Sequence, residues 1–465
     1  IKLMKNSMYK ITLILFFLLF SFKANSLDQF NFDVTEVEII DNGNKFIGKK
    51  RGKITTDESI IIEADEFEYD KQLNILNATG KIIINDTKKK IIINSDKIKY
   101  DKNLNIFYSK KNSRAINLED DIEIIAEKFE YNIDEENIIA EKNVILEDKK
   151  EDYKILSNFI SYSKKNKKIF SKGKTSANIL SKYNLKSEDV TFLTYSKQIS
   201  SSKKTTITDK TNLYALEKFI YFVDKEELRG EKIVIDANYN SPKNDKFYFS
   251  NAIINLKNQN FIAKDTKIEI HKNIFDNSDN DPRLVGVSSS RIGNVTTVNK
   301  SIFTSCKQTD NCPPWSIQAD KIIHDKDKKQ INYKNALLKI YDLPILYFPK
   351  FFHPDPTVER QSGILTPTLN NSNVLGNSLN LPYYHVISYD SDITITPSLF
   401  DSGVAMIQNE YRKVKKKSEF IIDFGFVNNF KSSIKNNKNS IFNLFSKYNL
   451  DLDLESFSTS ELFLN

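Results

Sequence analysis

The sequence is poor in the residues that build most metal and catalytic centres. Its 465 residues include two cysteines, four histidines and one tryptophan. The histidines lie far apart in the chain, and no nucleophile motif, phosphate-binding loop or metal-ligand spacing accompanies them. His353 and Asp355 resemble a base or metal pair, but prolines flank Asp355 and favour a tight structural turn. We therefore expect no cofactor, no metal site and no enzymatic activity.

The sequence also lacks a hydrophobic run of membrane-helix length, which needs about 20 residues. Its one strongly apolar stretch, residues 11–20, follows Lys5 and Lys10 and precedes Ala24-Asn25-Ser26. This order is typical of a cleaved signal peptide over residues 1–26, with a retained anchor as the alternative. The protein is therefore expected to be exported, and any membrane-spanning part is expected to be a β-barrel.

The excess of one sign of charge is small, since 68 lysines and arginines against 61 aspartates and glutamates give a net charge of +7. The basic cluster at residues 412–417 is interpreted as a solvated hairpin tip, and no nucleic-acid partner is expected. The chain begins at Ile1 and strand-like residues still arrive at residues 462–464, so we expect it to be a fragment of a longer protein.

The two cysteines are expected to form disulfides, because an exported chain meets an oxidising compartment. Cys306 and Cys312 lie six positions apart in the sequence. They could close on each other, or each could pair with a cysteine of a following segment.

A 31-residue repeat dominates the first half of the chain. Tyr69, Tyr100, Tyr131 and Tyr162 recur at this interval, and Leu76, Phe107, Ile138 and Ile169 keep the same register. Each unit alternates polar and apolar residues and turns at Asn, Lys or Gly, which is typical of β-strands. One unit cannot bury its apolar face alone, so the repeats are predicted to stack into a β-solenoid or elongated roll.

The interior of this roll is the candidate ligand site. The side chains predicted to line an apolar groove are Phe67, Tyr69, Ile98, Tyr100, Phe129, Tyr131, Ile160 and Tyr162. For any single tyrosine, simple core filling is the stronger interpretation. Periodicity does not decide whether the interior is filled or open. The end strands are expected to offer backbone edges that another β-protein could extend.

From about Gln361 the pattern changes to dyad-alternating segments of about ten residues separated by polar turns. Examples are residues 378–384, 392–397, 419–426 and 442–448. Transmembrane β-strands have this pattern. Because an open strand edge is not tolerated in lipid, these strands are expected to be the start of a barrel that continues beyond residue 465.

The segment joining the two halves resembles the LptD family of outer-membrane lipopolysaccharide-assembly proteins. The motifs are Asp281-Pro282-Arg283-Leu284, the Cys306 to Trp315 segment, residues 343–349, residues 353–367 and Leu381-Pro382-Tyr383-Tyr384, with the strongest match from Pro282 to Pro397. The repeats resemble the OstA-like periplasmic β-jellyroll of that family more loosely. The resemblance implies an all-β protein with residues 27–260 as jellyroll repeats, 261–360 as jellyroll end and connector, and 361–465 as the first barrel strands.

The resemblance also implies a function. In the family, the jellyroll receives lipopolysaccharide from an LptA-type periplasmic bridge protein and passes it into a barrel plugged by an LptE-type lipoprotein. It further implies an outer-membrane location with a periplasmic N-terminal domain, and a disulfide from Cys306 that ties the two parts together. The sequence has Cys312 close by and no cysteine just after the signal peptide. A local Cys306–Cys312 bridge therefore remains open.

Two prolines are candidates for a lateral gate. Pro367 and Pro382 fall within the first two predicted barrel strands. Proline donates no ladder hydrogen bond and should weaken pairing there, and the resemblance assigns a gate to the matching positions. Ordinary bulges or strand ends are the alternative, and Pro397 shows that a proline can occur in a third strand. The rival functions are a soluble periplasmic bridge protein and a porin-like transporter with a periplasmic repeat domain.

Overall fold

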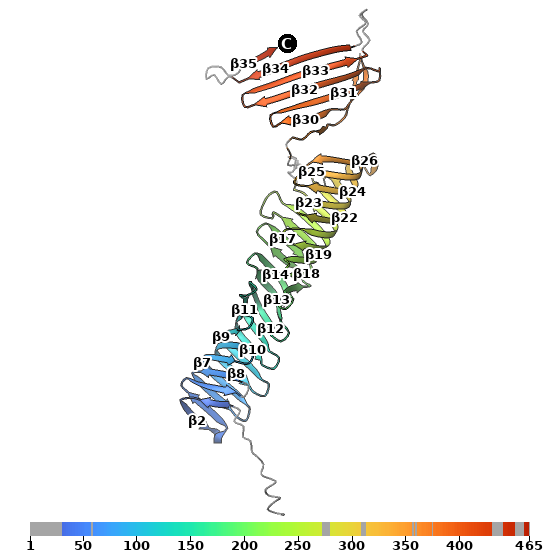
Figure 1. The fold of residues 1–465 in the computed structure, drawn as a ribbon. Helices are drawn as coiled ribbons and strands as arrows, with labels where there is room; N and C mark the ends of the chain where they lie inside the picture. Colours follow the sequence, from blue (N-terminus) through green and yellow to red (C-terminus); the bar gives the residue numbers. More distant parts are fainter. Residues whose placement is uncertain are drawn as a thin grey trace, which may run out of the picture. The chain divides into compact units, whose positions relative to one another are not determined.

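The computed structural model describes residues 30–56, 59–271, 280–307, 313–355, 358, 360–373, 375–429, 440–451 and 460–464. These residues form β-strands β1 to β35 and one short 3-10 helix, Asp41–Gly43 (Figure 1). The predicted all-β fold class is confirmed. No helix among the described residues is long and apolar enough to cross a membrane. The predicted signal peptide lies outside the described residues.

The chain divides into two compact units, which are described separately. The first unit comprises residues 1–321 and 335–347, and the second comprises residues 322–334 and 348–465. Three strands are divided between them: β24 (Trp315–Asp325), β25 (Gln330–Ile340) and β26 (Leu343–Pro354). The predicted domain boundaries at residues 260 and 360 stay predictions.

The first unit is an antiparallel succession of hairpins (Figure 1). Its strands are β1 (Phe30–Asp33), β2 (Glu36–Ile40), β3 (Lys45–Lys49), β4 (Gly52–Thr56), β5 (Ile60–Ala64), β6 (Glu66–Asp70), β7 (Ile75–Asp86), β8 (Ile91–Asp101), β9 (Ile106–Asn117), β10 (Ile122–Asn132), β11 (Asn137–Asp148), β12 (Tyr153–Ser163), β13 (Lys168–Ile179), β14 (Tyr183–Leu193), β15 (Gln198–Ser201), β16 (Thr205–Thr208), β17 (Asn212–Leu216), β18 (Lys218–Phe222), β19 (Glu227–Ala237), β20 (Asp245–Asn255), β21 (Phe261–Glu269), β22 (Arg283–Ile292) and β23 (Val295–Thr304). From β7 to β14 every strand pairs with the next one along the chain. The 31-residue repeat is therefore one pair of strands.

Most of the long strands change direction at their midpoint. The register between β7 and β8 shifts between Thr79 and Ile82, and the same irregularity recurs between β11 and β12 and between β13 and β14. The backbone at these midpoints has positive φ, at Gly80, Lys111, Lys142 and Gly173, which are 31 residues apart. A bulge with a left-handed residue bends a strand sharply. Each strand thus contributes to two walls that meet at a corner.

The turns stack in two rows, one at each end of the strands. The first turn row consists of residues 71–74, 102–105, 133–136, 164–167, 194–197 and 223–226, and the second of residues 87–90, 118–121, 149–152 and 180–182. Successive turns are joined by backbone hydrogen bonds, such as Ile133 N to Asn105 O in the first row and Lys149 N to Asp121 O in the second. Side chains add to the ladder, as where Asn74 donates to Asn103 at 2.9 Å.

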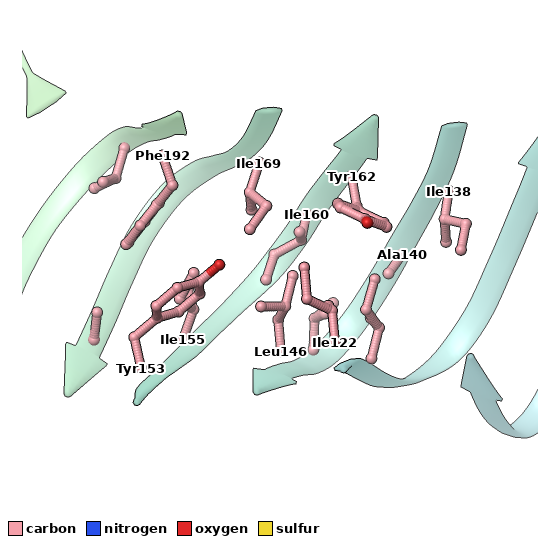
Figure 2. Close-up of a cluster of buried hydrophobic side chains, with 14 of the residues drawn as sticks. Ile122, Ile138, Ala140, Leu146, Tyr153, Ile155, Ile160, Tyr162, Ile169 and Phe192 are labelled. Carbon is pink, nitrogen blue, oxygen red and sulfur yellow. The ribbon is translucent and has the colours of Figure 1, made fainter. Parts of the chain in front are cut away.

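The space between the two walls is filled by apolar side chains. One buried cluster extends from Phe30 on β1 to Val298 on β23. Figure 2 shows part of it, with Ile155, Ile160, Tyr162 and Phe192 pointing into one interior. Burial alternates along the strands, as in β12, where Ile155 is fully buried and Leu156 is 43% exposed. The period-two pattern of the repeat therefore reports one buried face.

The second unit contains an antiparallel sheet. Its strands are β27 (Gly363–Ile364), β28 (Thr368–Ser372), β29 (Gly376–Asn380), β30 (Tyr383–Ser388), β31 (Ser391–Phe400), β32 (Ala405–Lys415), β33 (Ser418–Asn428), β34 (Ser440–Leu450) and β35 (Ser460–Leu464). From β30 to β35 each strand pairs with the next. The shorter strands pair as β27 with β30, β28 with β29, and β29 with β31.

Candidate functional site

The eight predicted groove residues all lie in the interior of the first unit. Each is at most 5% exposed and belongs to the buried cluster. They come in pairs from β6, β8, β10 and β12, as the 31-residue interval predicts. In the described conformation the interior is filled at these positions. A role of these residues in binding lipid stays a prediction.

The pairing register joins these side chains into two continuous rows. One row runs through Tyr69, Leu76, Tyr100, Phe107, Tyr131, Ile138, Tyr162, Ile169 and Phe192. The other alternates large and small residues: Phe67, Ala78, Ile98, Ser109, Phe129, Ala140, Ile160 and Ser171. Aromatic rings stack along the first row, with Tyr100 and Phe107 centroids 4.1 Å apart. The first row forms a continuous apolar track through the repeats, and the second row is apolar except at Ser109 and Ser171.

The tyrosine hydroxyls of this track are held by polar groups. Tyr131 donates to Asp86 Oδ2 at 2.9 Å, and the Tyr162 hydroxyl accepts from Asn117 Nδ2 at 2.6 Å. Burial raises the pKa of Tyr162, so its hydroxyl stays protonated. A buried polar group costs free energy unless it is hydrogen-bonded. These contacts allow large aromatic residues to fill the interior with their polar ends at its margin.

The sheet of the second unit has one apolar and one polar face. Because alternate residues share a face and the register is known, one face carries Leu369, Leu379, Leu399, Ile407, Phe426, Phe442 and Leu444, which are 40% to 83% exposed. Its margin carries Tyr383, Tyr411, Phe420 and Tyr448. The opposite face carries Thr394, Gln408, Glu410, Arg412 and Asp423. An exposed apolar face with an aromatic margin suits a lipid environment.

An ion cluster on the polar face connects Arg360, which precedes the sheet, to Asp392 and Arg412 within it. Asp392 is 6% exposed, forms an ion pair with Arg360 and accepts from Arg412 Nε at 2.9 Å. Arg360 also donates to the Tyr384 hydroxyl at 3.0 Å. Buried carboxylates persist when paired in this way. The sequence analysis missed this cluster, because nothing in the spacing of residues 360, 392 and 412 indicates that they meet.

The two candidate gate prolines lie in gaps between short strands. Pro367 separates β27 from β28, and Pro382 separates β29 from β30. The flanking strands pair on both sides, with Ile364 opposite Tyr383 and Thr368 opposite Asn380. Across the gap Leu365 N donates to Pro382 O at 2.8 Å. The two breaks therefore fall opposite each other in one interrupted hairpin, where the ladder is locally weak. A gating role stays a prediction.

Cys306 follows β23, is partly buried and has no disulfide partner among the described residues; its Sγ lies 3.7 Å from Trp315 O. Cys312 lies outside the described residues, so neither predicted disulfide pairing is tested. Near this segment β26 carries a run of exposed apolar residues, including Leu343, Ile345 and Tyr347, each more than half exposed.

His324 and His353 of the second unit belong to a small polar cluster at the end of β26. His324 contacts the Asp355 carboxylate, and His353 Nε2 lies 2.9 Å from the Tyr333 hydroxyl. Asp355 N donates to Lys329 O, and Asp355 O accepts from Val358 N, both at 2.9 Å. The predicted tight turn includes residues 356 and 357, which lie outside the described residues. Among the described residues, no group of three or more histidine, cysteine, aspartate or glutamate side chains could hold a metal ion.

Comparison with known proteins finds similarity to LPS-assembly proteins named LptD. The protein from Pseudoalteromonas translucida is 33% identical over 126 residues, which are 27% of this chain and 16% of that protein. Those of Legionella pneumophila strain Paris and Nitrosomonas europaea are each 32% identical, over 121 and 127 residues. These matches cover 26% and 27% of this chain and 14% and 17% of the relatives. The chain thus spans about one sixth of the relatives it matches. No family model matches the chain.

Proposed function

We propose that the chain is a member of the LptD family, to whose proteins about a quarter of its sequence is similar, and that it assembles lipopolysaccharide at the outer membrane. The observation that carries the proposal is the combination of a continuous apolar interior with a sheet whose apolar face is exposed. The first would carry acyl chains through the periplasm, and the second would sit in lipid. The proposed role is transport and not catalysis.

The chemistry of the substrate explains why such a track is needed. Moving one methylene from an apolar environment into water costs about 0.8 kcal/mol. Several acyl chains contain dozens of methylenes, so free diffusion through water would cost on the order of tens of kcal/mol. The apolar row from Tyr69 to Phe192, with the row from Phe67 to Ser171 beside it, supplies an alternative environment along the first unit. Because the interior is filled in the described conformation, the walls must separate when the lipid enters.

The sheet of the second unit, from β27 to β35, is proposed to be the membrane-embedded part. Its apolar face, with residues such as Leu399, Phe426 and Leu444, is exposed over several strands. Its polar face would line a lumen that accommodates the hydrated sugar. The first unit would then lie in the periplasm, in agreement with the predicted signal peptide. Release into the outer leaflet is proposed at the interrupted hairpin around Pro367 and Pro382, where few ladder bonds hold neighbouring strands.

Two protein partners are proposed. β2 is exposed along its whole length, with Val37 and Ile39 about half exposed. Such an end strand could pair with an LptA-type bridge protein by β-augmentation. An LptE-type lipoprotein is proposed as the plug of the completed barrel. Only the family relationship supports the plug.

The proposal is tested by photo-crosslinking in cells. Tyr100 and Phe129 are each replaced by a benzoyl-phenylalanine, and Lys99 serves as the outward-facing control next to Tyr100. Adducts with lipopolysaccharide are expected at both interior positions and not at Lys99. Outer-membrane fractionation and heat-modifiable migration of the full-length protein test the barrel. An absence of interior adducts in a folded protein would refute the transport role, and a soluble periplasmic protein would indicate a bridge component instead.

A further inference from the structure

The two turn rows of the first unit meet along one line, which we call the seam. A straight strand of 11 residues would separate its ends by roughly 36 Å. Nevertheless Tyr131, near the first-row end of β10, donates to Asp86 at the second-row end of β7. Tyr162 on β12 likewise contacts Asn117 at the end of β9. The walls are therefore folded over at the corner until their free margins touch.

Oppositely charged residues bridge the seam at successive levels. Lys89 in the second row pairs with Glu136 in the first, and Lys164 in the first pairs with Glu119 in the second at 2.9 Å. The next levels are Lys197 with Glu151 at 2.7 Å and Lys182 with Glu226 at 3.5 Å. The partners are separated by 44 to 47 residues in each case. Four successive bridges of the same kind make the seam a repeated feature.

Several of these side chains are less exposed than ordinary surface charges. The Lys164 side chain is 12% exposed, Glu226 is 12% exposed, and Lys89 and Glu136 are 27% and 20% exposed. The ammonium group of Lys164 also holds the pKa of Glu119 below its usual range. Partly exposed ion pairs are individually weak. A ladder of them closes the margin while leaving it able to open without loss of the hydrogen-bonded walls.

A small cavity lies directly beneath one of the bridges. It has a volume of about 30 Å³ and is lined by Glu151 and Lys197 together with core residues Tyr153, Phe192, Ile199 and Val223. Figure 2 shows Tyr153 and Phe192 within the buried cluster, and their ring centroids are 5.8 Å apart. The space would hold a water molecule but not an acyl chain. The interior is thus loosely filled directly behind an ion pair.

The Tyr153 hydroxyl marks this cavity as polar at one point. Tyr153 is 8% exposed, and its hydroxyl faces the Asp148 carboxylate at the end of β11. Burial is the main cause of its raised pKa, followed by the nearby Asp148 carboxylate. The hydroxyl and this carboxylate are thus polar groups at the edge of the cavity, where a ligand could hydrogen-bond to them.

We infer that the seam is the lateral entrance through which an anionic amphipathic lipid enters the interior, and that its lysines exchange glutamate for the anionic head group. The inference rests on the proposed function. Acyl chains that lie between the walls must leave their head group at the seam, where Lys89, Lys164 and Lys197 are already placed to pair with an oxyanion. New ion pairs between these lysines and the head group would replace the lysine–glutamate pairs that break when the seam opens.

The entrance is tested by bridging the seam in the full-length protein. Glu151 and Lys197 are both replaced by cysteine and joined with a short, reducible thiol-reactive linker. A benzoyl-phenylalanine at Tyr153 reports lipopolysaccharide added to the detergent-solubilised protein. Closing the seam is expected to lower the adduct yield roughly tenfold, because only the open fraction binds, and reduction should restore it. The matched control bridges Lys97 and Lys110, which are exposed on neighbouring strands β8 and β9 away from the seam.

The outcomes separate the two proposals. If the protein without linker gives no adduct at Tyr153 and none at Tyr100, the proposed function fails. If it gives adducts that the seam linker does not reduce more than the control linker does, the seam is not the entrance and the inference is overturned. A loss that is reversed by reduction supports it.

The head-group role is tested by breaking the same ion pairs from opposite sides. The variant Lys89→Gln/Lys197→Gln and the variant Glu136→Gln/Glu151→Gln both remove the pairs Lys89–Glu136 and Lys197–Glu151. If the lysines bind the head group, only the lysine variant loses adduct yield, by roughly threefold or more for two lost charge-assisted contacts. The glutamate variant should keep or increase it. Equal adduct yields from the two variants would overturn this part of the inference. So would a loss of yield in the lysine variant that is the same for native and for dephosphorylated lipopolysaccharide.

Discussion

Adjacent residues in the two units differ in their environment although their sequence pattern is alike. In β12 of the first unit, Ile155 is fully buried while Leu156 is 43% exposed. In β32 of the second unit, Ile407 is 45% exposed and its polar neighbour Gln408 is exposed as well. Alternation therefore indicates which side chains share a face. It does not indicate what covers that face.

The difference follows from how each unit deals with its apolar face. The first unit folds every wall at a corner near Gly80, Lys111, Lys142 or Gly173 and buries the apolar face against itself. In the second unit the strands from β31 to β34 pair in continuous register, and the apolar residues remain on the outside. A sheet of this kind needs a nonpolar surrounding. We propose that lipid provides it.

The largest expected effect is loss of the interior packing of the first unit. Ile155→Ala removes a fully buried side chain and is expected to cost about 2–5 kcal/mol, since the rigid walls leave a cavity. Leu156→Ala, on the outward face of the same strand, should cost less than about 0.5 kcal/mol. Urea unfolding of both variants measures the difference. Equal destabilisation would mean that the two faces of β12 are not distinct.

A charge placed on the exposed apolar face is the next largest effect. Ile407→Arg is expected to cost about 2–4 kcal/mol if the face contacts the middle of a bilayer. It should lower the amount of heat-modifiable protein in the outer membrane. Gln408→Arg is the matched control, because the neighbouring residue points to the polar face. A normal level of the Ile407 variant would show that this face does not contact lipid.

The sequence was sufficient to predict the strand register of the repeats. The tyrosines from Tyr69 to Tyr162 recur at one interval, and the structure places them in one row with Leu76 and Phe107 between them. The alternation and the turn residues were clear signals, because the two strands of each hairpin are adjacent in the sequence and are joined by a turn of three or four residues. The corners were not predicted, since a lysine or asparagine with positive φ, such as Lys142, looks like any surface residue in the sequence.

The contacts that close the interior could not be predicted. Lys89 and Glu136 are 47 residues apart and are two charged residues in a chain rich in both signs. Their meeting depends on the fold of the walls at the corners. The same holds for Arg360 and Asp392. Whether the interior is filled was also undecided by the pattern, because alternation is identical for an open and a closed groove.

The polar ends of buried tyrosines give a finer contrast between the units. In the first unit Tyr131 and Tyr162 pair with Asp86 and Asn117. In the second unit Tyr333 pairs instead with His353, a residue type whose ordinary pKa lies near neutral pH. The His353 ring also contacts the Pro354 carbonyl at 2.7 Å, and Asp355 and His324 are the charged or titratable groups that act on it.

This contrast predicts a pH dependence confined to the second unit and smaller than the effects above. Burial lowers the pKa of His353 below its ordinary value of about 6.5. As the pH falls, the unfolded chain therefore binds a proton at this histidine before the folded chain does. The free energy of unfolding is expected to be constant in this respect above about pH 6.5 and to decrease below it. His353→Gln should flatten this decrease in unfolding followed between pH 7.5 and 5. An equal slope in the His353 variant would show that its burial does not influence stability.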